Sequence, residues 1–128
     1  MFHDVVFRAT TKWHYDPRSD RGAHSRAALE RLWASWPGGP ERRLVVTLGA
    51  TGSIAFSPVE DAVFAPGHDV DTCSSIGAGD AFSAGFCTAL IRGATVTQSL
   101  KLGNACGAFA VSHRGILDAL PFVADVAV

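Results

Sequence analysis

Four residues near the middle of the chain have the types and the order that could bind an anion and accept a proton. Gly77, Ala78 and Gly79 precede Asp80 where an irregular segment gives way to a helical pattern. The first N–H groups of a helix have no partner within it, and the helix dipole adds partial positive charge, so such a junction can bind phosphate oxygens. An aspartate is ordinarily ionised at neutral pH and can accept the proton of an attacking hydroxyl. The arrangement suits phosphoryl transfer.

The same four residues also have a purely structural interpretation. An aspartate in the first turn of a helix, after glycines, is ordinary capping chemistry, because helix N-termini recruit acidic side chains without any catalysis. Two other segments have the same ambiguity. Thr47-Leu48-Gly49 could simply end a strand, and Gly52 could serve a turn that needs a positive φ. The small residues around Asn104 could permit close helix packing, or could leave room for a flat ring whose edge the Asn104 amide contacts.

Apolar periodicity predicts the elements that would position these residues. The continuous apolar run at 44–48 is typical of a buried strand in a parallel sheet. The full set is a strand at 4–7, a loop at 8–22, helices at 23–36, 78–92 and 97–113, a β-hairpin from 53–56 and 62–65, and a last short helix that begins at Pro121. Strands that alternate with helices, together with one hairpin, predict an α/β domain.

Composition limits the class of protein. The chain has 128 residues, 48% of them hydrophobic and 18% charged, which suits one globular domain. No apolar stretch approaches the roughly 20 residues that span a bilayer, and the start has no leader pattern, so we expect a cytoplasmic protein without a membrane partner. The cysteines form no metal-binding pair and suit a reduced compartment; we expect Cys87 and Cys106 to be buried and Cys73 to lie in a loop.

Charge is distributed unevenly along the chain. The net charge is −1, but residues 1–43 contain eight Lys or Arg and five Asp or Glu, whereas residues 44–128 contain three and seven. A basic first third could indicate nucleic-acid binding. Its charges are mixed, however, and no recognition-helix or aromatic pattern accompanies them, so a solvated surface is the better interpretation and we expect no nucleic-acid partner.

Three segments together resemble one enzyme family. The stretch from Val70 to Phe86, with Asp71-Thr72 and then the Gly-Ala-Gly-Asp sequence, is similar to the second signature of the ribokinase (PfkB) carbohydrate kinases, D-T-x-G-A-G-D followed by an apolar helix. Residues 45–53 are similar to that family's strand and turn beside the nucleotide. Residues 103–115 are similar to its small-residue helix near the adenine. The resemblance covers residues 44–128, in the family's order.

The resemblance implies a fold and an activity. The fold would be an incomplete ribokinase-like α/β fold, the C-terminal part of a central, mostly parallel sheet flanked by helices, with one β-hairpin. Residues 44–128 would form its nucleotide-binding part, and residues 1–43 a partial N-terminal strand, loop and helix with a weak family match. The activity would be ATP-dependent phosphoryl transfer to the hydroxyl of a sugar, a nucleoside or a similar small molecule, with Mg²⁺ as a cofactor and a monovalent cation as a further candidate.

It also implies roles for particular residues. Asp80 would be the catalytic base, and the anion hole would be formed by Gly77, Ala78 and Gly79. The remaining positions would contact the nucleotide: Thr47, Gly49 and Gly52 near the phosphates or ribose, and Asn104 with Ala108 near the adenine.

The sequence departs from the family pattern in three ways. Residues 73–76 intervene before Gly-Ala-Gly-Asp, so either this loop contains an insertion or Ser74-Ser75 occupy the D-T positions, which leaves Asp71 a weak candidate for a cation ligand. The family's N-x-x-E signature is absent, so no metal ligand is assigned. The sugar-binding half has no counterpart in this chain, which indicates a truncated form. An exposed sheet edge could then favour a homodimer. The alternative is a non-catalytic nucleotide-binding or interaction module derived from such a kinase.

Overall fold

The computed structural model describes residues 4–8 and 20–113, with side chains described over 27–113. The predicted elements within these ranges are all present, and α1 begins three residues before the predicted start, so the end of the predicted 8–22 loop is helical. The predicted helix at Pro121 lies outside the described residues. The elements are β1 (Asp4–Arg8), α1 (Asp20–Ser35), β2 (Arg43–Thr47), the 3-10 turn η1 (Gly49–Thr51), β3 (Gly52–Phe56), β4 (Val63–Pro66), α2 (Ala78–Ile91) and α3 (Val96–Ser112).

The four strands form one sheet in the order β1-β2-β3-β4. β1 and β2 are parallel, whereas β2, β3 and β4 form an antiparallel meander in which Ile54 lies opposite Val46 on one side and Phe64 on the other. The predicted hairpin of β3 and β4 is confirmed. β2 was predicted to lie in a parallel sheet; it is parallel to β1 but antiparallel to β3. A parallel crossover needs about a dozen residues or more, and η1 is far too short for one.

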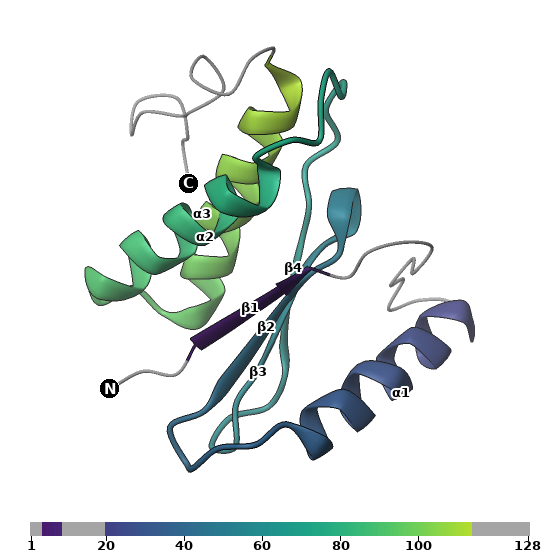
Figure 1. The fold of residues 1–128 in the computed structure, drawn as a ribbon, viewed down its shortest axis with the longest axis vertical. Coiled ribbons are helices and arrows are strands. Elements are labelled where there is room, and N and C mark those ends of the chain that lie inside the picture. Colours follow the sequence, from purple (N-terminus) through teal and green to yellow (C-terminus); the bar gives the residue numbers. More distant parts are fainter. Residues whose placement is uncertain (1–3, 9–19, 114–128) are drawn as a thin grey trace.

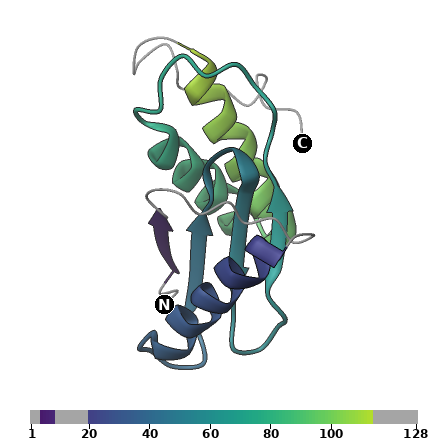
Figure 2. The ribbon, with the colours of Figure 1, turned by 90° about the vertical axis from the view of Figure 1, so that its right-hand side faces the viewer.

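Helices cover both faces of the sheet. Figures 1 and 2 show α1 on one face and the pair α2 and α3 on the other, so the described residues form three layers. β2 alternates between these layers: Leu44 and Val46 pack toward α1, and Val45 packs toward α2 and α3. A strand that is covered on both faces has no solvent side, which is why its sequence is a continuous apolar run.

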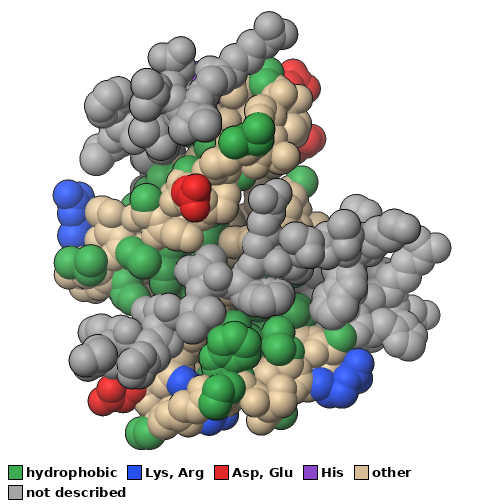
Figure 3. Space-filling view, in the orientation of Figure 1, with side chains coloured by type: hydrophobic (Ala, Val, Ile, Leu, Met, Phe, Trp, Pro, Cys, Tyr) green, Lys and Arg blue, Asp and Glu red, His purple; other side chains and the backbone are tan. Residues whose placement is uncertain are grey.

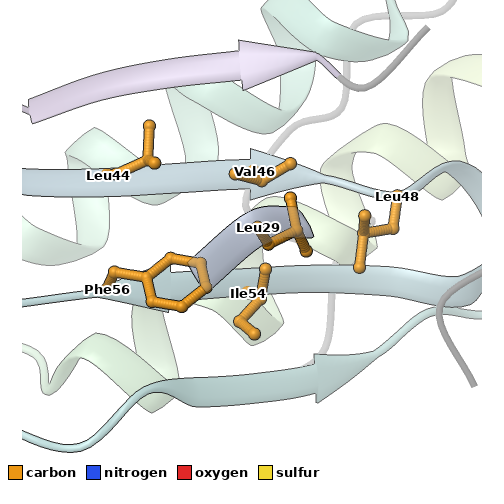
Figure 4. Packing of buried hydrophobic residues seen from close by; sticks show 6 residues of the cluster. All are labelled: Leu29, Leu44, Val46, Leu48, Ile54 and Phe56. Carbon is orange, nitrogen blue, oxygen red and sulfur yellow. The ribbon is translucent and has the colours of Figure 1, made fainter. Parts of the chain in front are cut away.

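The core beneath α1 joins this helix to β2 and β3. Leu29 of α1 is 1% exposed and points at Ile54 and the other apolar side chains of the two strands (Figure 4). Trp33 stacks on Phe56 with ring centroids 6.0 Å apart. Full burial of a leucine or phenylalanine contributes about 1.5–3 kcal/mol. The N-terminal segment with the weak family match therefore shares a core with the strands that follow it.

The second core lies between the sheet and the pair α2 and α3. Phe82, Phe86 and Leu100 pack there against the other face of the sheet. Cys106 is also buried, and this burial raises the pKa of its thiol. The expected burial of Cys87 is wrong: α2 turns the side that contains Phe82 and Phe86 to the core, and Cys87, the next residue, faces solvent.

Basic side chains are scattered over the surface seen in Figure 3. Lys and Arg stand at separate places there and form no continuous basic patch among the coloured residues. Within the ranges that the structure describes, no helix combines the length and the apolar character needed to cross a membrane.

Candidate functional site

A cleft of about 440 Å³ lies where the ends of β2 and β4 meet the start of α2 and the second half of α3. This volume falls within the range of about 300–1,000 Å³ that is typical of small-molecule sites. Four segments line it: the turn from β2 to β3 (Thr47, Gly49, Ala50 and Gly52), the loop after β4 (His68, Asp69, Val70, Thr72 and Ser75), the start of α2 (Ala78, Gly79 and Phe82) and α3 (Asn104, Gly107, Ala108 and Val111).

The start of α2 offers unpaired backbone amides. Its N-cap, Gly77, has φ 84°, a left-handed conformation that glycine adopts without strain. The first full helical hydrogen bond is donated by the N–H of Ala81 to the carbonyl of Gly77, at 2.9 Å. Among the described residues, the N–H groups of Gly79 and Asp80 have no acceptor. These two amides, at the positive end of the helix dipole, are suited to bind an anion.

Asp80 is exposed in this first turn, one residue after Gly79, which lines the cleft. Its carboxylate makes no hydrogen bond or ion pair with any residue that the structure describes, and no side chain caps α2 by a hydrogen bond. The purely structural interpretation therefore reduces to the favourable contact of a negative charge with the helix dipole. Asp80 and Gly77 are not among the residues that line the cleft; they lie at its edge, next to Ala78 and Gly79.

The structure brings the five residues predicted to contact the nucleotide together at this cleft. Thr47, Gly49, Gly52 and Ala108 line the same cleft as the start of α2, although they come from distant parts of the sequence. Asn104 also lines it, but this side chain is 8% exposed and both of its N–H groups are donated to backbone carbonyls. The donor that we expected at a purine edge is thus already used within the protein.

The floor of the cleft contains a close crossing of two backbone segments. A Cβ atom at Gly52 would lie 2.0 Å from the carbonyl oxygen of Ala65, and one at Gly67 would lie 2.2 Å from that of Ala50. The N–H of Gly67 donates to the carbonyl of Thr51 at 2.9 Å. The turn η1 and the exit of β4 can approach this closely because neither glycine has a side chain.

Sequence reasoning missed the wall that the loop after β4 contributes. His68 and Asp69 line the cleft and are the titratable side chains among its lining residues; no Lys or Arg belongs to that set. The order of the strands could have indicated this contact, because the loop leaves β4 at the same edge of the sheet at which β2, the strand of Thr47, ends. Among the described residues at this cleft, the groups suited to contact phosphate are the backbone amides at the start of α2.

The loop before α2 bears on the two alternatives for the D-T positions. The hydroxyl of Ser74 accepts a hydrogen bond from the N–H of Ile76 at 3.2 Å, which is the local turn that an aspartate also forms. Ser75 lines the cleft, whereas Asp71 is exposed outside it. The turn at Ser74 is compatible with the alternative in which Ser74-Ser75 occupy the D-T positions. Thr72 lines the cleft as Ser75 does, however, so the cleft lining does not separate the two alternatives. No group of three potential metal-ligating side chains occurs in the described part of the chain.

Solved structures define the fold. The chain is similar to ribokinase from Cryptococcus neoformans in complex with ADP, with a TM-score of 0.69 and 22% identity over 80% of this chain and 32% of that one. It is also similar to a ribokinase II from E. coli in complex with ATP and Mg²⁺, with a TM-score of 0.65 and 22% identity over 92% and 35% of the two chains. The described residues thus have part of a ribokinase-type α/β fold.

Sequence comparison then gives the family. The model of the pfkB family carbohydrate kinases matches residues 23–122, and this chain belongs to that family. It is 37% identical to an ATP-dependent ribose-1-phosphate kinase of Halopiger xanaduensis over 59% of this chain and 25% of that enzyme. It is 28% identical to a 5-dehydro-2-deoxygluconokinase of Shouchella clausii over 98% of this chain and 37% of that enzyme. The chain thus spans a quarter to somewhat over a third of the length of these relatives.

Proposed function

We propose that this chain forms the nucleotide-binding part of an ATP-dependent phosphotransferase that acts on the hydroxyl of a sugar or sugar-like substrate. One observation carries the proposal: the unpaired amides of Gly79 and Asp80 lie at a cleft of about 440 Å³, beside an exposed carboxylate. Relatives whose names include sugar and riboside kinases support it. A cytoplasmic setting fits three cysteines that are all free.

In the proposed mechanism, the amides at the start of α2, of which those of Gly79 and Asp80 are unpaired, bind phosphate oxygens of ATP. The turn from Thr47 to Gly52 lies along the phosphates or ribose. The Asp80 carboxylate accepts the proton of the substrate hydroxyl while its oxygen attacks the γ-phosphorus. The bond between that phosphorus and the bridging oxygen breaks, and ADP leaves. The amides stabilise the charge on the moving phosphoryl group. Mg²⁺, which the family resemblance implies together with ATP, would neutralise charge on the phosphates when bound; we assign it no ligand among the described residues.

The substitution Asp80→Asn tests this assignment. We expect ATP-dependent phosphorylation of a panel of sugars and nucleosides to fall by about 10²–10⁴-fold, because general-base catalysis contributes that much. Binding of ADP, measured by calorimetry, should stay close to that of the unmodified chain. Equal phosphorylation by the two proteins would remove Asp80 from the mechanism.

A second candidate is a non-catalytic nucleotide-binding or interaction module. It is favoured by the position of Asp80, which lies outside the set of residues that line the cleft. Under this alternative, ADP or ATP would raise the melting temperature of the chain, but none of the panel compounds would be phosphorylated. The same purified protein therefore distinguishes the two candidates.

A further inference from the structure

A buried polar pair connects α3 to the sheet beneath the cleft. Ser53 is 0% exposed and Asn104 is 8% exposed. The Ser53 hydroxyl donates to Oδ1 of Asn104 at 2.8 Å, and Nδ2 of Asn104 donates to the carbonyls of Ala65 and Pro66, each at 3.1 Å. A primary amide has two N–H donors, and both are used here. Asn104 therefore has no donor left for a ligand.

These three bonds join three elements that surround the cleft. Ser53 lies on β3, Asn104 lies on α3, and the two carbonyls lie at the end of β4. The next residue after Pro66 is Gly67, whose N–H donates to the carbonyl of Thr51. The wall formed by the loop after β4 begins directly beyond it. The place where β4 ends therefore sets where that wall lies relative to the turn η1.

We propose that Ser53 and Asn104 are positioning residues for the nucleotide cleft, and that Asn104 acts through the exit of β4 rather than by contacting the purine. The expected effect of the pair on nucleotide affinity rests on the function proposed above. The expected effect of the pair on the backbone crossing at Gly67 does not depend on that function. A buried carbonyl or hydroxyl that loses its partner is costly, so the exit of β4 would shift or open when the pair is broken.

Ser53 separates positioning from direct contact. It is fully buried and does not line the cleft, so it cannot touch a bound nucleotide. Ser53→Ala removes one hydroxyl and leaves Oδ1 of Asn104 without its donor. Ser99→Ala is the matched control, because Ser99 is also 0% exposed and its hydroxyl donates to the carbonyl of Thr95 at 2.9 Å, at the start of α3. Ser99 does not line the cleft.

The experiment measures two quantities in the 128-residue chain and in each variant: hydrogen exchange of the Gly67 amide by NMR, and ADP affinity by calorimetry. We expect Ser53→Ala and Asn104→Ala each to raise Gly67 exchange by roughly tenfold and to weaken ADP binding by a similar factor. The double variant should resemble Asn104→Ala alone, because both changes break one unit. Ser99→Ala should change neither quantity.

Each contrary outcome has a definite meaning. Gly67 exchange in Ser53→Ala equal to that of the unmodified chain overturns the inference. Weaker ADP binding in Asn104→Ala, with Ser53→Ala unchanged in both quantities, identifies Asn104 as a direct contact and also overturns it. If Asn104→Ala does not fold, Ser53→Ala decides alone. If the unmodified chain binds neither ADP nor ATP, the proposed function fails, while the Gly67 exchange still decides whether the pair positions the backbone.

Discussion

Gly103 of α3 lies so close to Phe82 of α2 that a Cβ atom on Gly103 would be 2.7 Å from Cε2 of the phenylalanine ring. Phe82 is buried and lines the cleft, so this contact sets both the spacing of the two helices and one wall of the site. The side chain that Gly103 lacks is what allows the ring to fill the space between the helices.

Gly103→Ala should therefore destabilise the chain. The added methyl group has no room, and overpacking of this kind costs about 1–3 kcal/mol. Urea unfolding, followed by tryptophan fluorescence, measures the change in the free energy of unfolding. Gly107→Ala is the matched control on the same helix: its Cβ would meet the carbonyl oxygen of Ala78 at 3.4 Å, which is ordinary contact. Equal stabilities of the two variants would contradict the packing argument.

The backbone crossing beneath the cleft gives a second prediction. Gly67→Ala would place a methyl carbon 2.2 Å from the carbonyl oxygen of Ala50, which cannot move aside as a flexible side chain can. We expect a loss of at least about 1–3 kcal/mol in the free energy of unfolding. Gly39→Ala, at a position where a Cβ meets nothing within 4 Å, should stay within about 0.5 kcal/mol of the unmodified chain. A Gly67→Ala protein of unchanged stability would contradict the crossing.

Much of the fold was predictable because local patterns fix it. The apolar run of β2, the hairpin of β3 and β4, and the helices α2 and α3 all follow from periodicity and from glycine or proline at their ends. The strand directions were harder, because a buried strand looks the same whether its neighbours are parallel or antiparallel. Burial of single helical residues was also uncertain: Cys87 is as apolar as Cys106 but lies on the side of α2 that faces solvent.

The candidate site was predictable in part. The signature around Asp80 and the small-residue helix pointed to the cleft because their residue types are unusual together. The wall at His68 and Asp69 was not predicted, because a loop without a motif has no periodicity, and only the path of the chain after β4 brings it to the cleft. Nor could the sequence reveal that Ser53 and Asn104 bond to each other across 51 positions.

The cysteines give a third prediction. Burial disfavours the Cys106 thiolate and raises its pKa, so at about pH 8 a smaller fraction is ionised than in an ordinary cysteine. Iodoacetamide should modify the exposed Cys73 and Cys87 in the native chain and spare Cys106, and in urea all three should react. Peptide mass spectrometry identifies the modified positions. Native Cys106 reacting as fast as Cys87 would contradict its burial.

The same shift makes stability depend on pH, which is a fourth prediction. The unfolded chain releases the Cys106 proton at a lower pH than the folded chain does, so above the ordinary thiol pKa the unfolded state binds fewer protons. The free energy of unfolding should consequently fall as pH rises through that range. Cys106→Ala should show a weaker decline between about pH 8 and about pH 10 than the unmodified chain does. Parallel declines in the two proteins would assign the effect to other groups.

The last prediction separates binding of an anion from stability. At Gly79 a Cβ atom would meet nothing within 4 Å, so Gly79→Ala has room in the folded chain and gains helix propensity of about 0.5–1 kcal/mol. Its methyl group would lie beside the unpaired amides at the start of α2 and obstruct phosphate. We therefore expect equal or higher stability with weaker ADP binding. Thr88→Ala, an exposed change further along α2, should leave ADP binding unchanged. If Gly79→Ala binds ADP as tightly as the unmodified chain, these amides do not hold phosphate.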